Sequence, residues 1–122
     1  KPVPLYGDGK HVRDWLYVED HCRGIDLTLQ SGKLGEIYNI AAGNYVSNLK
    51  LTKLILAKLH KPETLLKFVK DRPGHDYRYA MDSTKIKKLG FKPRHKFEDA
   101  IKQTIEWYKK FFSSGSTEIF PA

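Results

Sequence analysis

The chain has 122 residues, 40% of them hydrophobic, which predicts one compact domain and leaves no room for a second. It carries 22 Lys and Arg against 14 Asp and Glu, a net charge of +8, which favours anionic partners such as nucleotides or nucleic acid. A solvated basic surface explains most of the lysines equally well. Cys22 is the only cysteine, which excludes an internal disulfide, and no apolar run approaches the ~20 residues that span a bilayer. We therefore expect a cytoplasmic protein without a membrane partner.

The sequence begins at Lys1 with a Pro-x-Pro segment and has neither an initiating Met nor a signal-peptide core. We expect a fragment or a processed product rather than a natural start.

The first half of the chain alternates between predicted strands and helices. Prolines exclude helix near the start, and the helix that follows Glu19 carries Cys22, Ile25 and Leu29 on one face before it stops near Gly32. In order, we expect an extended segment at 3–6, a turn at 7–10, a strand at 15–18, a helix at 19–32 and a strand at 36–41.

The second half continues the alternation. We expect a helix capped by Ser47 or Asn48 and ended by Pro62, a strand at 65–70, a short extended piece at 77–81, a small helix at 83–89 and a long helix at 97–112. This pattern predicts an α/β fold with a small mixed sheet and flanking helices.

Two arginines lie in short segments that contain Gly or Pro. Arg13 follows the turn at 7–10, and Arg72 lies in Asp-Arg-Pro-Gly-His-Asp at 71–76. A guanidinium group presents a planar fork of donors that meets phosphate oxygens two at a time, so two converging arginines suit a nucleoside diphosphate. The alternative for Arg13 is a salt bridge to a nearby carboxylate: Asp14, Glu19 or Asp20.

The same segments carry a family resemblance. Arg-Asp-Trp-Leu-Tyr-Val-Glu-Asp at 13–20 and the segment at 71–76 are both complete and in order. Together they resemble the carboxy-terminal, substrate-binding part of the extended short-chain dehydrogenases, and most closely the dTDP-glucose 4,6-dehydratase family. The resemblance implies the substrate lobe of that fold, without its Rossmann lobe, as a sugar-nucleotide-binding domain at 1–112. A flexible tail at 113–122 follows.

The resemblance also implies roles for individual residues. In the family, the arginines that match Arg13 and Arg72 contact the diphosphate, and the asparagine that matches Asn48 contacts the phosphate and ribose region. On the sequence alone Asn48 is more often a helix cap, and both roles are compatible because a helix N-terminus binds anions. The family segment that runs along the nucleotide base matches three residues of the first extended segment: Pro4, Leu5 and Tyr6. Tyr6 could equally lie in the core.

The histidines, the cysteine and the serines give weaker indications of function than the arginine motifs do. His75 matches the family's motif histidine near the nucleotide, although a lone His is more often a structural hydrogen-bonding residue. The five histidines show no paired spacing, and the single Cys offers no second thiolate, so we expect no metal site. No Gly-x-Ser-x-Gly sequence occurs, and we assign no catalytic residue.

The family binds NAD through a Gly-rich turn between a strand and a helix and activates its substrate with a Tyr-x-x-x-Lys pair. The turn Gly7-Asp8-Gly9 lacks that context, and the pair of Tyr6 and Lys10 has the right spacing but crosses the turn. We expect that NAD and its hydride chemistry belong to a missing amino-terminal Rossmann lobe. This chain alone is then expected to have no dehydratase turnover.

The function expected from the resemblance is the substrate-binding portion of a dTDP-glucose 4,6-dehydratase-like enzyme, an NAD-dependent lyase of deoxysugar biosynthesis. Its expected partners are a dTDP-sugar, the Rossmann lobe and further copies in a homo-oligomer. The near alternative is the substrate lobe of a related epimerase or decarboxylase. The distant alternative is a basic nucleic-acid-binding module, which is disfavoured because the lysines are spread and no nucleic-acid motif occurs.

Overall fold

The structure is a computed structural model that describes residues 1–115. Strands and helices alternate along most of the chain, which confirms the predicted α/β class with flanking helices. The elements are β1 (Val3–Tyr6), β2 (Val12–Asp14), α1 (Val18–Ser31), β3 (Tyr45–Ser47), α2 (Asn48–Lys58), the 3-10 helix η1 (Glu63–Leu65), β4 (Leu66–Val69), α3 (Thr84–Lys88) and α4 (Phe97–Ser113). Of the tail expected at 113–122, residue 113 is the last of α4, and residues 116–122 lie outside the described residues.

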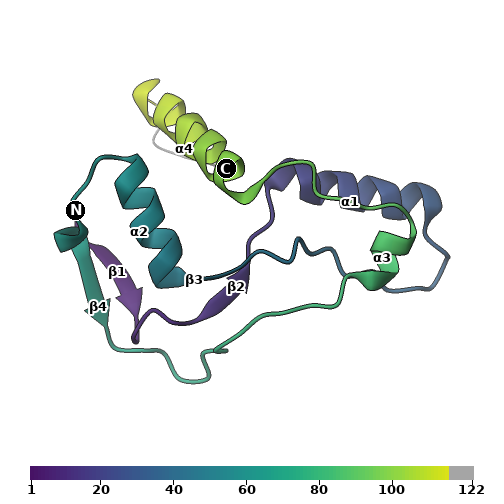
Figure 1. Ribbon diagram of the computed structural model, residues 1–122, viewed down its shortest axis with the longest axis horizontal. Coiled ribbons are helices and arrows are strands. Elements are labelled where there is room, and N and C mark those ends of the chain that lie inside the picture. The colour runs from purple at the N-terminus through teal and green to yellow at the C-terminus, as the bar shows by residue number, and fades with distance from the viewer. Residues whose placement is uncertain (116–122) are drawn as a thin grey trace.

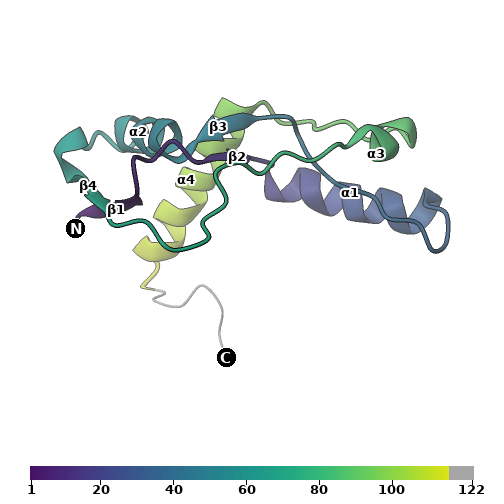
Figure 2. The same cartoon turned by 90° about the horizontal axis from the view of Figure 1, so that it is seen from below.

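The strands form two small sheets. Strands β1 and β4 run parallel, with Val3 opposite Leu66, and β2 runs antiparallel to β3, with Arg13 opposite Val46. In Figures 1 and 2, β1, β4 and α2 lie at one end of an elongated molecule and α1 and α3 at the other. Strand β2 runs between these two ends, and a single bridge joins its first residue, Val12, to the later segment at Arg78.

Helix α2 is fixed to the turn between β1 and β2. The Ser47 hydroxyl accepts a hydrogen bond from the N–H of Lys50 at 3.2 Å, so Ser47, and not Asn48, is the cap. The N–H of Leu49 donates to the carbonyl of Gly9. Leucines buried on α2 and β1 form the core of this end of the molecule: Leu5, Leu51 and Leu56.

A buried carboxylate joins α1 to the segment before α4. Asp20 is fully buried and accepts hydrogen bonds from the backbone N–H groups of Arg94 and His95 at 2.9 and 3.0 Å and from the Arg23 guanidinium. Burial raises the pKa of Asp20, but these N–H donors outweigh it and hold the pKa below its usual range. The acidic first turn of α1 therefore has a structural role as well as a favourable position for negative charge.

Several predicted elements differ from the observed ones. The strand expected at 15–18 is wrong, because the strand ends at Asp14 and α1 begins at Val18. The strand expected at 36–41 is also wrong: after Glu36, no backbone hydrogen bond of this segment occurs within residues 1–115. Strand β3 was not predicted, because three residues are too few for an alternating pattern to show.

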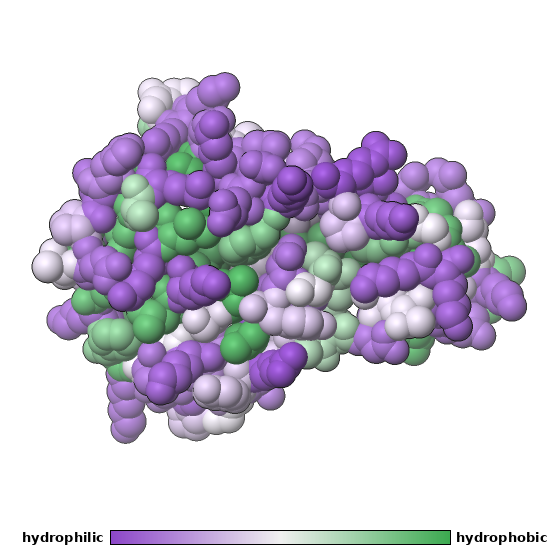
Figure 3. All heavy atoms as spheres, viewed as in Figure 1, coloured by the Kyte–Doolittle hydropathy of each residue, from purple (hydrophilic) through white to green (hydrophobic). Residues whose placement is uncertain are grey.

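The helical predictions agree better. The helices at 48–58, 84–88 and 97–113 fall where they were expected, and so does the strand at 66–69. However, the apolar face predicted for α1 is not buried: Leu29 is 81% exposed, and Leu34 just beyond the helix is fully exposed. Figure 3 shows apolar atoms reaching the surface between polar ones. None of the described helices combines the length and the apolar character that crossing a membrane requires.

Candidate functional site

The Arg13 guanidinium fastens β2 to the loop at 71–76. Its NH2 donates to the Asp76 carbonyl at 2.8 Å and lies 3.0 Å from His75 Nε2, while its NH1 donates to the Val12 carbonyl at 2.7 Å. No salt bridge forms between Arg13 and a carboxylate within residues 1–115, so the alternative predicted for Arg13 is wrong. The two arginine segments, far apart in sequence, therefore meet at this guanidinium.

Tyr79 packs against the Arg13 guanidinium and bonds the loop. The Arg13 guanidinium lies over the Tyr79 ring at 4.2 Å, and the Tyr79 hydroxyl donates to Asp76 at 2.8 Å. This hydrogen bond raises the pKa of Tyr79, and the positive charges of Arg13 and Arg72 oppose the rise. The Arg72 side chain is exposed and makes no hydrogen bond or ion pair to any other described residue.

Asp71 lies at the centre of the polar contacts behind the arginines. Its carboxylate accepts from the N–H of Arg72 at 2.9 Å and lies 2.7 Å from His75 Nδ1 and 3.1 Å from His11 Nε2. The hydrogen bond from His75 lowers the pKa of Asp71; partial burial opposes it and the Arg72 N–H adds to it. The two imidazole rings stack at 3.8 Å.

These three side chains also satisfy the spacing of a metal site. Among the described residues, His11, Asp71 and His75 form the one group whose ligand atoms all lie within 4.8 Å of one another. The spacing of the histidines in the sequence did not indicate this group, because His11 lies some sixty residues before Asp71 and His75. Since the rings are nearly parallel, at 16°, one ion cannot lie in the plane of both, where their nitrogen lone pairs point. The geometry suits a shared carboxylate better than a shared ion.

Asn48 lies beside the site, at the first residue of α2. Its backbone N–H donates to the His11 carbonyl at 2.9 Å. The next two N–H groups of the helix are occupied by the Gly9 carbonyl and the Ser47 hydroxyl. The helix N-terminus is therefore not open to an anion, which removes that part of the prediction and leaves the Asn48 side chain as the group that could reach a ligand.

The segment predicted to contact the nucleotide base, Pro4 to Tyr6 in β1, touches the loop at 71–76. The Tyr6 ring is half-exposed and meets the His75 ring edge to face at 6.3 Å. The Leu5 side chain is buried, so only its backbone is available to a ligand, while Pro4 is exposed. Tyr6 therefore does not lie in the core.

Asp14 has a structural role that the sequence analysis did not assign. Its carboxylate accepts from the N–H groups of Gly43 and Asn44 at 2.9 and 3.0 Å and fixes the turn before β3. The signal was weak, because an Asp at a strand end and a Gly-Asn turn thirty residues later are each common. The roles of Tyr79, Asp71 and His11 were missed for the same reason: they depend on contacts between distant segments.

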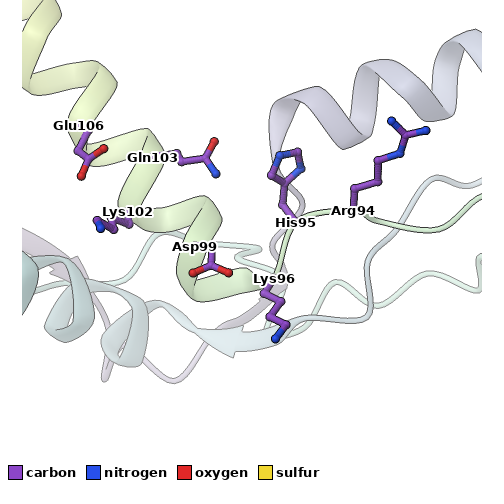
Figure 4. Close-up of a pocket in the computed structure, with 7 residues that line it drawn as sticks. All are labelled: Arg94, His95, Lys96, Asp99, Lys102, Gln103 and Glu106. Carbon is purple, nitrogen blue, oxygen red and sulfur yellow. The ribbon is translucent and has the colours of Figure 1, made fainter.

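A surface pocket lies away from these residues. A hollow of about 420 Å³ lies beside α4 and the segment before it, lined by Arg94, His95, Lys96, Asp99, Lys102, Gln103 and Glu106 (Figure 4). In this view Gln103 and His95 project into the gap between α4 and α1, whereas Lys96 points away. Acidic and basic groups alternate along its wall, so it offers no concentrated charge for a diphosphate.

The glycines of the first turn do not fit a dinucleotide site. They join β1 to β2, and not a strand to a helix. A Cβ on Gly9 would lie 2.4 Å from the Leu5 side chain and 3.0 Å from that of Leu49, so the absence of a side chain serves close packing. This turn is therefore not the Gly-rich turn of a dinucleotide fingerprint.

Comparison with known proteins shows that this combination of two small sheets and flanking helices matches part of the dehydratases and epimerases of the extended short-chain dehydrogenase class. Residues 1–104 match the family model of the GDP-mannose 4,6 dehydratases, and the chain belongs to that family. A dTDP-glucose 4,6-dehydratase of Actinoplanes sp. is 48% identical over 108 residues, which cover 88% of this chain and 34% of the relative.

Solved structures give the same result. The dTDP-glucose 4,6-dehydratase of Streptomyces venezuelae, crystallised with NAD bound, superposes with a TM-score of 0.89 at 42% identity over 93% of this chain and 35% of its own. The UDP-glucose 4-epimerase of Thermotoga maritima, solved with UDP-glucose, gives a TM-score of 0.85 at 30% identity over 92% and 36%. The chain spans about a third of the length of the curated relatives it matches.

Proposed function

We propose that this chain is the substrate-binding part of a dTDP-glucose 4,6-dehydratase-like enzyme and that it binds the diphosphate of a dTDP-hexose. The observation that carries the proposal is the meeting of both arginine segments at one place, through the bonds from Arg13 to Asp76 and His75. Arg72 extends from the same loop with its guanidinium uncommitted to any described residue. Two cations at one loop suit a ligand that carries two adjacent negative charges.

The two arginines have different parts in this proposal. Arg72 supplies an open fork of donors to the phosphates. Arg13 donates through NH2 to the Asp76 carbonyl of the loop and through NH1 to the Val12 carbonyl of its own strand, so it supplies charge and holds the loop against β2. Asn48 and the backbone of β1 lie on either side and are the proposed contacts for the ribose and the base.

The similarity favours a dehydratase over an epimerase. Identity to the dehydratases is 42–48%, against 30% for the Thermotoga maritima epimerase over a similar share of the chain. The proposed remainder of the enzyme is an amino-terminal Rossmann lobe that binds NAD and performs the hydride chemistry. A homo-oligomer and a cytoplasmic location belong to the same proposal.

We call Arg13 and Arg72 together the diphosphate clamp. Calorimetric titration with dTDP tests whether this clamp binds the nucleotide. Arg72→Ala and Arg13→Ala are each expected to weaken binding by about 1.5–3 kcal/mol, or roughly ten- to a hundredfold in Kd, because each removes a charged donor. Arg94→Ala is the matched control, since this exposed arginine lines the pocket beside α4, and its affinity should equal that of the unmodified chain.

The same titrations separate the alternatives. A preference for dTDP over UDP supports the dehydratase, and an equal affinity for both supports an epimerase. Tight, steeply salt-dependent binding of duplex DNA would support the nucleic-acid module. Unchanged dTDP affinity in both arginine variants would contradict the clamp.

A further inference from the structure

Four polar side chains form a continuous line of contacts from β2 into the interior, in the order Arg13, His75, Asp71 and His11. We propose that His75 is a positioning residue, which holds the Arg13 guanidinium in place as its Nδ1–H tautomer with Asp71 and His11 behind it. The identity of the ligand that Arg13 would bind rests on the proposed function. The arrangement of the four side chains does not depend on it.

The tautomer of His75 follows from its neighbours. Arg13 can only donate, so His75 Nε2, 3.0 Å from the guanidinium, must offer a lone pair. The proton of the neutral ring then lies on Nδ1, which is 2.7 Å from the Asp71 carboxylate. Both ring nitrogens are thereby committed, and none remains for a ligand. This arrangement favours the structural alternative that the sequence left open for His75.

His11 supports the far side of Asp71. It is 5% exposed, and its Nε2 faces the carboxylate at 3.1 Å, while its Nδ1 is buried without a partner among the described residues. A proton on that Nδ1 would be a buried donor without an acceptor, which is unfavourable. His11 is therefore expected as the opposite tautomer, with its proton on Nε2. Its ring stacks on His75 and restricts how His75 can turn.

Asp71 connects this line to the second arginine. The same carboxylate that orients His75 also accepts the backbone N–H of Arg72. The Asp71 carboxylate therefore fixes the side chain of Arg13 through His75 and the backbone of Arg72 directly. A change at His75 is expected to disturb Arg13 directly and to leave the open fork of Arg72 in place.

The tautomers can be read without any ligand. Long-range proton–nitrogen NMR correlations of the imidazole rings are expected to show His75 protonated on Nδ1 and His11 on Nε2 at neutral pH, with His21→Phe confirming the assignment of a third, exposed ring. A proton on His75 Nε2 would overturn the proposal, whether or not the chain binds a nucleotide. Absence of dTDP binding, in contrast, would count only against the proposed function.

Variants separate positioning from packing. His75→Phe keeps the stacked ring but loses both nitrogens, and it is expected to weaken dTDP binding about tenfold and to increase the motion of the Arg13 Nε–H in nitrogen relaxation. His75→Gln, whose amide can donate to Asp71 and accept from Arg13, is expected to restore most of both. Combining His75→Phe with Arg13→Ala should weaken binding no further than Arg13→Ala alone. Fully additive losses, or a rigid Arg13 in His75→Phe, would contradict the proposal.

Discussion

At the scale of the residue, Asp20 is a buried group that joins α1 to the segment before α4. Its buried carboxylate accepts two backbone N–H groups and lies 3.1 Å from His95 Nδ1. A carboxyl whose pKa is lower in the folded than in the unfolded chain stabilises the fold above its ordinary value near 3.8. That stabilisation is lost as the pH falls through the lower, folded value.

Asp20→Asn is therefore expected to lower the free energy of unfolding by about 2–3 kcal/mol at pH 7, because the amide oxygen can replace only one carboxylate oxygen and the N–H₂ would face the backbone donor of either Arg94 or His95. Urea unfolding measures this loss, with the exposed Asp26→Asn on the same helix as the control. Part of the acid sensitivity below the ordinary pKa should also disappear in Asp20→Asn. An equal loss in both variants, or an unchanged acid profile, would show that Asp20 is not the joint.

At the scale of the elements, Gly9 determines how β1 turns into β2 beneath α2. Its φ is +71°, in the left-handed region, and its missing Cβ leaves room for the Leu5 and Leu49 side chains. Gly35 has a similar φ of +78° but has no atom within 4 Å of a would-be Cβ. Substituting Ala at Gly35 therefore measures the cost of the backbone conformation alone, whereas Ala at Gly9 adds the steric overlap with neighbouring side chains.

Gly9→Ala is expected to destabilise the chain by about 2–4 kcal/mol, the sum of the left-handed backbone cost and the overlap with Leu5, and Gly35→Ala by about 1–2 kcal/mol. Thermal or urea unfolding of the two variants measures the difference. Equal losses would mean that the turn has room to move away from α2.

The same elements show how far sequence patterns extend. Helix α4 was predicted almost to the residue, because seventeen residues with an apolar stripe give a strong signal. The segment at 36–41 has a strand-like sequence, but strand formation needs a neighbouring backbone edge, and the described residues provide none there. The arginine motifs could be recognised from their residue sequence. The contacts of Asp71 and His11, in contrast, exist only once β2 and the loop at 71–76 come together.

At the scale of the whole molecule, the exposed apolar face of α1 is the main feature. Val18, Ile25 and Leu29 on the helix, with Leu34 and Ile37 after it, are all exposed large hydrophobic residues. Exposed large apolar side chains promote association. The sequence also leads us to expect that Ile119 and Phe120 contribute to such association, but they lie outside the described residues.

We therefore expect the 122-residue chain to self-associate, and Leu29→Glu with Leu34→Glu to shift it towards the monomer. Sedimentation velocity over a concentration series measures this. A strictly monomeric chain at all concentrations would show that the exposed apolar residues of α1 do not drive self-association.

The most direct measurement of the diphosphate clamp is an NMR titration of the chain with dTDP, observed at the arginine Nε–H groups. The expected result is a large, saturable shift of the Arg72 and Arg13 signals, with the Asn48 side-chain amide following and Arg94 unmoved. Shifts confined to Arg94 and the pocket beside α4, or uniform small shifts over all arginines, would place the nucleotide elsewhere and contradict the clamp.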